Sequence, residues 1–110
     1  MNHGLSDATV ERIRGVLAHF PEVEKAVLYG SRAKGTHRPS SDIDLTLCGI
    51  ALRQPQLARI EEALDDLLLP YQIDLSEMES LTHPALLEHI HRVGIVFYEK
   101  SAMSQASLPS

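Results

Sequence analysis

The chain of 110 residues has the length of one small domain, with room for a single hydrophobic core. Its 44% apolar and 23% charged residues are ordinary for a globular protein, and no apolar run reaches the roughly 18–20 residues that span a bilayer. The net charge of −5 argues against direct nucleic-acid binding, which usually needs a basic surface. Because the lone Cys48 cannot form an intrachain disulfide and no secretory signal is readable, we expect a cytoplasmic protein that does not bind membranes.

Periodicity divides the chain into alternating helices and strands. Apolar residues recur at helical spacing in two segments, a capping residue followed by proline indicates a third helix, and short apolar or strictly alternating segments between them are typical of strands. In chain order the sequence predicts a helix over 5–19, a strand over 23–29, a polar segment over 30–41, a strand over 42–48, a helix over 54–69, a strand over 71–75, a helix from 84 to about 92 and a strand over 95–98. Ser6 and Thr82 are the expected N-caps of the first and third helices, while Pro70 and Gly94 end the second and third.

This order of elements indicates the α/β fold class, as a single small domain with one central sheet and flanking helices. We expect the domain to occupy residues 1–99. Residues 100–110 are small and polar, and they predict a disordered tail.

Two aspartates on one strand provide the first functional signal. Asp42 and Asp44 are two residues apart on the predicted strand and therefore project from the same face. Two neighbouring carboxylates repel each other unless a cation lies between them, and Mg²⁺ prefers carboxylate and phosphate oxygens. Asp74 alternates in the same sense on the 71–75 strand, so the three carboxylates would meet if the strands are neighbours. Such a cluster suits two metal ions about 3.5–4 Å apart, although a solvated polar face would also carry acids.

The polar segment that precedes this strand provides the second signal. At Gly30 the main chain can approach a ligand closely, and Ser31 offers a hydroxyl and a backbone N–H. The following residues could open a short helix whose N-terminus favours phosphate, and Arg32 and Lys34 could meet polyphosphate charge. The alternative is a simple strand-ending turn whose cations are only solvated.

Taken together, Gly30-Ser31, ten residues and then Asp42-Ile43-Asp44-Leu45, with Asp74 on a later strand, resemble the signature of the DNA polymerase β-type nucleotidyltransferase superfamily. The short length and the ending over 90–98 are more narrowly similar to the minimal nucleotidyltransferases, or MNT proteins. The resemblance covers roughly residues 8–99. It implies the polymerase β-type fold with a mixed sheet.

The resemblance also implies a role for each motif residue. Gly30 and Ser31 would hold the triphosphate of ATP, the substrate, and Arg32 and Lys34 are candidates for further phosphate contacts. The two Mg²⁺ ions would be held by Asp42, Asp44 and Asp74. Asp74 would also help to activate the acceptor hydroxyl.

Members of the MNT family often pair with a HEPN-domain RNase toxin. The resemblance therefore implies an antitoxin that transfers AMP to a toxin tyrosine and forms a hetero-oligomer with the toxin. Three alternatives stay open: a small-molecule, aminoglycoside-type nucleotidyltransferase, a non-catalytic module that masks its partner, and a regulatory domain acting with separate nucleotide-binding subunits.

The histidines of the third predicted helix do not form a metal motif. His83, His89 and His91 lack the i, i+4 spacing of a helical zinc pair. We interpret them as part of a solvated or partner-facing helix.

Overall fold

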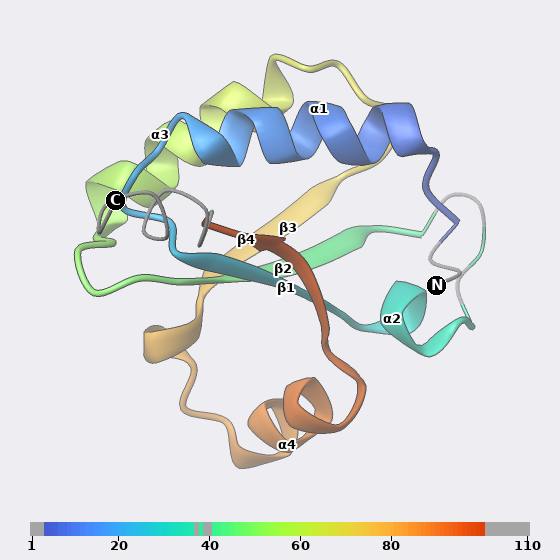
Figure 1. Ribbon diagram of the computed structural model, residues 1–110. Helices are drawn as coiled ribbons and strands as arrows, with labels where there is room; N and C mark the ends of the chain where they lie inside the picture. Colours follow the sequence, from blue (N-terminus) through green and yellow to red (C-terminus); the bar gives the residue numbers. More distant parts are fainter. Residues whose placement is uncertain (1–3, 37, 39–40, 101–110) are drawn as a thin grey trace, which may run out of the picture.

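A computed structural model describes residues 4–36, 38 and 41–100 (Figure 1). Its elements are α1 (Asp7–Ala18), β1 (Lys25–Tyr29), α2 (Ser31–Lys34), β2 (Ile43–Cys48), α3 (Gln54–Asp65), β3 (Ile73–Glu77), the 3₁₀ turn η1 (Met78–Ser80), α4 (Pro84–Val93) and β4 (Ile95–Glu99). The predicted α/β class is confirmed.

The four strands form one mixed sheet in the order β3-β2-β1-β4. β1 is antiparallel to both of its neighbours, whereas β2 and β3 are parallel. Parallel neighbours need a crossover connection, and α3 provides it. α1 and α3 cover one face of the sheet, and α4 lies on the other (Figure 1).

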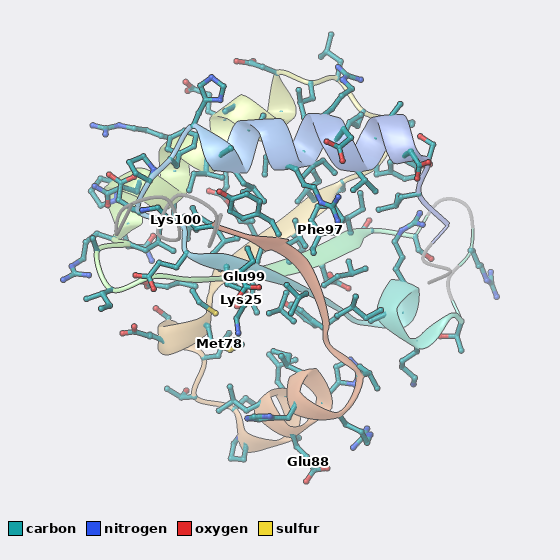
Figure 2. All side chains as sticks on the ribbon, viewed as in Figure 1. Lys25, Met78, Glu88, Phe97, Glu99 and Lys100 are labelled. Carbon is teal, nitrogen blue, oxygen red and sulfur yellow. The ribbon has the colours of Figure 1, made fainter. Side chains whose placement is uncertain are left out.

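The hydrophobic core fills the layer between the sheet and the α1–α3 pair. Its fully buried strand residues are Ala26, Leu28, Ile43, Leu45 and Leu47, and its fully buried helix residues include Ile13, Leu17 and Ile60. Phe97 of β4 lies beneath α1 (Figure 2). The guanidinium of Arg14 is 5.6 Å from the centre of the Phe97 ring. Burying each large apolar side chain contributes about 1.5–3 kcal/mol, so this face supplies most of the folding free energy.

The predicted N-cap is confirmed for α1 and is wrong for α4. Ser6 is the N-cap of α1, and its hydroxyl accepts the N–H of Thr9 at 3.1 Å, as predicted. The N-cap of α4 is His83 and not Thr82, and the prediction was wrong there. The Nδ1 atom of His83 accepts the N–H of Leu86 at 3.4 Å, so an imidazole takes the place of the expected hydroxyl.

The segment between α3 and β3 also departs from its prediction. The helix ends at Asp65 and not at 69, because Leu68 has a left-handed φ of 54° that an α-helix cannot contain. β3 covers 73–77 and not 71–75, since its pairing with β2 begins at the partners Ile43 and Ile73.

The C-terminal boundary is described only as far as Lys100. This first residue of the predicted tail donates its backbone N–H to the Glu24 carbonyl at 2.8 Å. The rest of the predicted tail, 101–110, lies outside the described residues. Within the described ranges, no helix is both long and apolar enough to cross a membrane.

Candidate functional site

The polar residues of three strands meet on the face of the sheet opposite the α1–α3 layer. Asp44 of β2 is the register partner of Asp74 of β3 on one side and of Tyr29 of β1 on the other. Partners on neighbouring strands project from the same face, so the two carboxylates lie side by side. Asp42 lies just before β2, two residues from Asp44, and its side chain is exposed.

The surroundings of Asp44 disfavour its charged form. Burial raises the pKa of the Asp44 carboxyl above its ordinary value, and the negative charges of Asp74 and Asp42 raise it further. The pKa of the Tyr29 phenol is also raised, first by burial and then by Asp44 and Asp74, against the lowering influence of the Ser76 hydroxyl. A cation bound here would relieve the repulsion among the three carboxylates.

The three aspartates do not form a ready-made metal site. Among the described residues, no group of three or more His, Cys, Asp or Glu side chains is arranged to hold a metal ion. The donor set still fits Mg²⁺, because this ion usually binds one or two carboxylates and completes its octahedron with water and substrate phosphate oxygens.

Gly30 brings the main chain against Asp44. Its backbone has φ 78° and ψ −157°, a conformation open essentially to glycine alone. A Cβ atom built at Gly30 would collide with Oδ2 of Asp44, so the close approach also requires the absence of a side chain. Ser31 follows as the first residue of α2 and is partly exposed.

The two cations of α2 have different environments. Arg32 is only 1% exposed, and its Nε and Nη2 atoms donate to the Ser41 carbonyl at 3.2 and 3.0 Å. Its guanidinium also lies 4.8 Å from the ring centre of Tyr71. Arg32 thus ties α2 to the segments that lead into β2 and β3. Lys34, two residues on, is exposed and can reach a ligand in solution.

The sequence predicts a solvated or partner-facing position for His89, and this is wrong, because its partly buried side chain lies against Gly30 and Tyr29. Its Nε2 atom accepts the N–H of Gly30 at 3.1 Å, and its ring meets Tyr29 edge to face, with centroids 6.3 Å apart. Helical spacing did carry a signal, because His89 lies three residues after Leu86 and four before Val93 and so shares their inward side. The contact with Gly30 joins distant parts of the chain, and no local pattern could reveal it.

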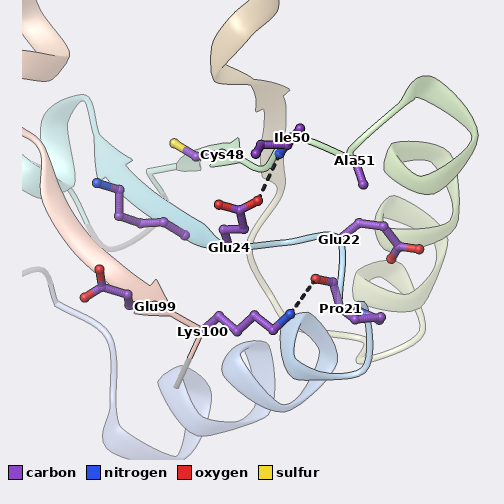
Figure 3. A pocket seen from close by; sticks show the side chains of 9 residues that line it. Pro21, Glu22, Glu24, Cys48, Ile50, Ala51, Glu99 and Lys100 are labelled. Atoms are coloured by element: carbon purple, nitrogen blue, oxygen red, sulfur yellow. Dashed lines mark hydrogen bonds between the residues drawn. The ribbon is translucent and has the colours of Figure 1, made fainter. Parts of the chain in front are cut away.

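The hollow drawn in Figure 3 lies at the other end of the sheet. It measures about 890 Å³ and is lined by Pro21, Glu22, Glu24, Lys25, Cys48, Ile50, Ala51, Glu99 and Lys100. None of the predicted site residues belongs to this lining. Burial raises the pKa of the Cys48 thiol, which disfavours the reactive thiolate there.

The comparison with protein families agrees with this geometry. Residues 11–103 match the family described as polymerase beta, nucleotidyltransferase. The chain therefore belongs to the polymerase β-type nucleotidyltransferases, and the predicted fold and family are confirmed. A search of curated proteins finds no significant match.

Solved structures show the same fold at low sequence identity. A toxin–antitoxin complex with AMP-PNP contains a chain that is 20% identical, with a TM-score of 0.67, over 88% of this protein and 78% of that chain. A tri-AMPylated HEPN toxin of Shewanella oneidensis in complex with its MNT antitoxin gives 16% identity and a TM-score of 0.65, over 93% and 78%. An MntA–HepT toxin–antitoxin complex gives 17% and 0.63, over 90% and 76%.

Proposed function

We propose that this protein is a Mg²⁺-dependent nucleotidyltransferase that transfers AMP from ATP to a tyrosine of a HEPN-domain toxin, and that it acts as the cytoplasmic antitoxin of that toxin in a hetero-oligomer. The observation that carries the proposal is the register of Asp44 with Asp74, together with the Gly30 turn that lies against Asp44. The similar structures add support, since one is described as an MNT antitoxin with an AMPylated toxin and another as a complex with an ATP analogue.

The residues of this face suit each part of such a reaction. The acceptor hydroxyl oxygen would attack the α-phosphorus of ATP, the bond to the bridging oxygen would break, and pyrophosphate would leave. Asp74 is exposed beside Asp44 and would accept the hydroxyl proton. Ser31 and Lys34 would contact the triphosphate, whereas Arg32 would keep the segment before Asp42 in place.

Two Mg²⁺ ions held by Asp42, Asp44 and Asp74 would neutralise phosphate charge and orient the attacking and leaving oxygens. Since Mg²⁺ usually takes only one or two protein carboxylates and completes its coordination with water and substrate phosphates, we expect the ions to bind strongly only together with ATP. Calorimetry should therefore show weak Mg²⁺ binding to the protein alone and much tighter binding in the presence of a non-hydrolysable ATP analogue.

The test is to purify the protein with its partner HEPN protein and to measure intact mass and RNase activity after incubation with ATP and Mg²⁺. We expect the toxin to gain whole AMP units and to lose RNase activity at substoichiometric amounts of this protein, because an enzyme turns over. EDTA should prevent both effects. A masking module would instead inhibit equally without ATP, only at one-to-one stoichiometry and with no change of mass. That result would refute the proposal.

A further inference from the structure

We propose that His89 is a positioning residue for nucleotide binding: by accepting the Gly30 N–H, it fixes the turn that presents Ser31 to the triphosphate. This inference rests on the proposed function above and deepens it. It also assigns the Gly30 N–H to the protein itself, so that Gly30 contributes its backbone conformation and not a hydrogen bond to phosphate.

The contact is specific in its chemistry. A backbone N–H can only donate, so Nε2 of His89 must be the unprotonated nitrogen, and the proton of the neutral ring is on Nδ1. The edge-to-face contact with Tyr29 holds the same imidazole from the residue before Gly30. Two neighbouring residues of one chain segment thus hold the ring in one orientation.

α4 is anchored close to β1, which gives His89 a firm base. A Cβ atom at Gly94 would come within 2.8 Å of Cγ1 of Val27 and would also collide with the Ile90 carbonyl. The end of α4 therefore packs tightly on β1, and Ile90 beside it is buried. Glu88, on the other side of His89, points away from the sheet in Figure 2.

Glycine is the residue at which such an anchor has the greatest effect. As a glycine, Gly30 has more backbone freedom than any other type of residue would have at this position. Without the hydrogen bond to His89, its turn would sample several backbone states. Binding of a triphosphate would then have to select one of them, which weakens the apparent affinity in proportion to its population. The hydrogen bond from Gly30 to His89 removes this loss in advance.

Three variants test the inference through the affinity for ATP with Mg²⁺, measured by calorimetry at pH 8. We expect His89→Ala to weaken binding about three- to tenfold, the range that one net hydrogen bond supplies. His89→Gln keeps a neutral acceptor at a similar reach and should stay within about twofold of the parent protein. His91→Ala is the matched control, since His91 is exposed on the same helix, and its affinity should not change.

A second readout needs no nucleotide. By NMR, the Gly30 amide should be protected from hydrogen exchange in the parent protein, in His91→Ala and in His89→Gln, and should lose protection in His89→Ala. Unchanged affinity in His89→Ala, with or without a lower melting temperature, would overturn the positioning role. If the parent protein bound no ATP, the proposed function would fail, and Gly30 exchange would then decide alone whether His89 holds the turn.

Discussion

The two faces of the sheet differ in what their side chains do. On the α1–α3 face, alternate residues of β2 are fully buried apolar side chains, Ile43, Leu45 and Leu47. On the α4 face, the residues between them begin with Asp44 and continue with Thr46. One face thus stabilises the fold, while the other is free to collect charges that repel one another. A small domain can carry an unfavourable carboxylate cluster because the opposite face supplies the stability.

Removing the carboxylates should show the largest effect. With Asp42→Asn and Asp44→Asn combined, we expect AMP transfer to fall by more than about a hundredfold, since even the supporting partners of metal ligands matter 10- to 100-fold. The melting temperature should not fall, because Asp42 is exposed and Asp44 is only partly buried, so neither carboxylate packs in the core. Asp65→Asn, at the exposed end of α3, is the control and should transfer normally. A normal rate in the double variant would refute the assigned chemistry.

Neighbouring residues of β2 allow the two faces to be compared directly. Leu45→Ala should lower the free energy of unfolding by about 2–5 kcal/mol, because it leaves a cavity in the core. Thr46→Val should be neutral or stabilising, since the buried Oγ1 of Thr46 has no hydrogen-bond partner among the described residues. Urea denaturation measures both. A larger loss of unfolding free energy for Thr46→Val than for Leu45→Ala would show that the α4 face contributes more to stability than the α1–α3 face.

Substitution of the two α2 cations should affect stability differently, because Arg32 is buried in the fold and Lys34 is exposed. Arg32→Lys should destabilise the protein by about 1–2 kcal/mol, because an ammonium cannot reproduce the paired donors or the stacking on Tyr71. Lys34→Arg should change stability by less than about 0.5 kcal/mol, as expected for an exposed position. Thermal unfolding distinguishes the two, and equal shifts would contradict the structural role of Arg32.

The smallest effect is a pH dependence of stability. Because the pKa of Asp44 is raised in the folded state, the folded protein holds this proton more tightly than the unfolded chain does. Stability is therefore lost as pH rises from the ordinary carboxyl pKa through the raised one. Asp44→Asn should be more stable than the parent protein at pH 7, by less than about 1 kcal/mol for a charge screened by solvent, and the gain should vanish in acid. A gain that persists at low pH would point to another cause.

The sequence predicted most of the helices and strands, and the face on which Asp44 lies, because both rest on local patterns. The alternation of Ile43, Leu45 and Leu47 fixed which way Asp44 points, and Ser6 correctly marked the start of α1. The apolar run at Leu67–Leu69 extended the predicted helix too far, since periodicity does not reveal the left-handed turn at Leu68.

What the sequence could not show depends on contacts between distant segments. The register that places Asp74 beside Asp44 is set by pairing across the α3 crossover. Arg32 resembled a free phosphate ligand because nothing near it predicts the Ser41 carbonyl and the Tyr71 ring that cover it. The position of His89 could not be predicted for the same reason, since its contact with Gly30 depends on how α4 packs on the sheet.

The strand order has a consequence for synthesis on the ribosome. β1 is the first strand to be made, yet it lies between β2 and β4, and β4 is the last. Until β4 emerges, one edge of β1 is unpaired. α4 precedes β4 in the chain, so at that stage no strand yet holds the C-terminal end of α4 against the sheet. The hydrogen bond between the Gly30 N–H and His89 therefore forms late, after Glu99 has been synthesised. Nascent chains that are arrested before β4 should expose an open strand edge, which favours aggregation.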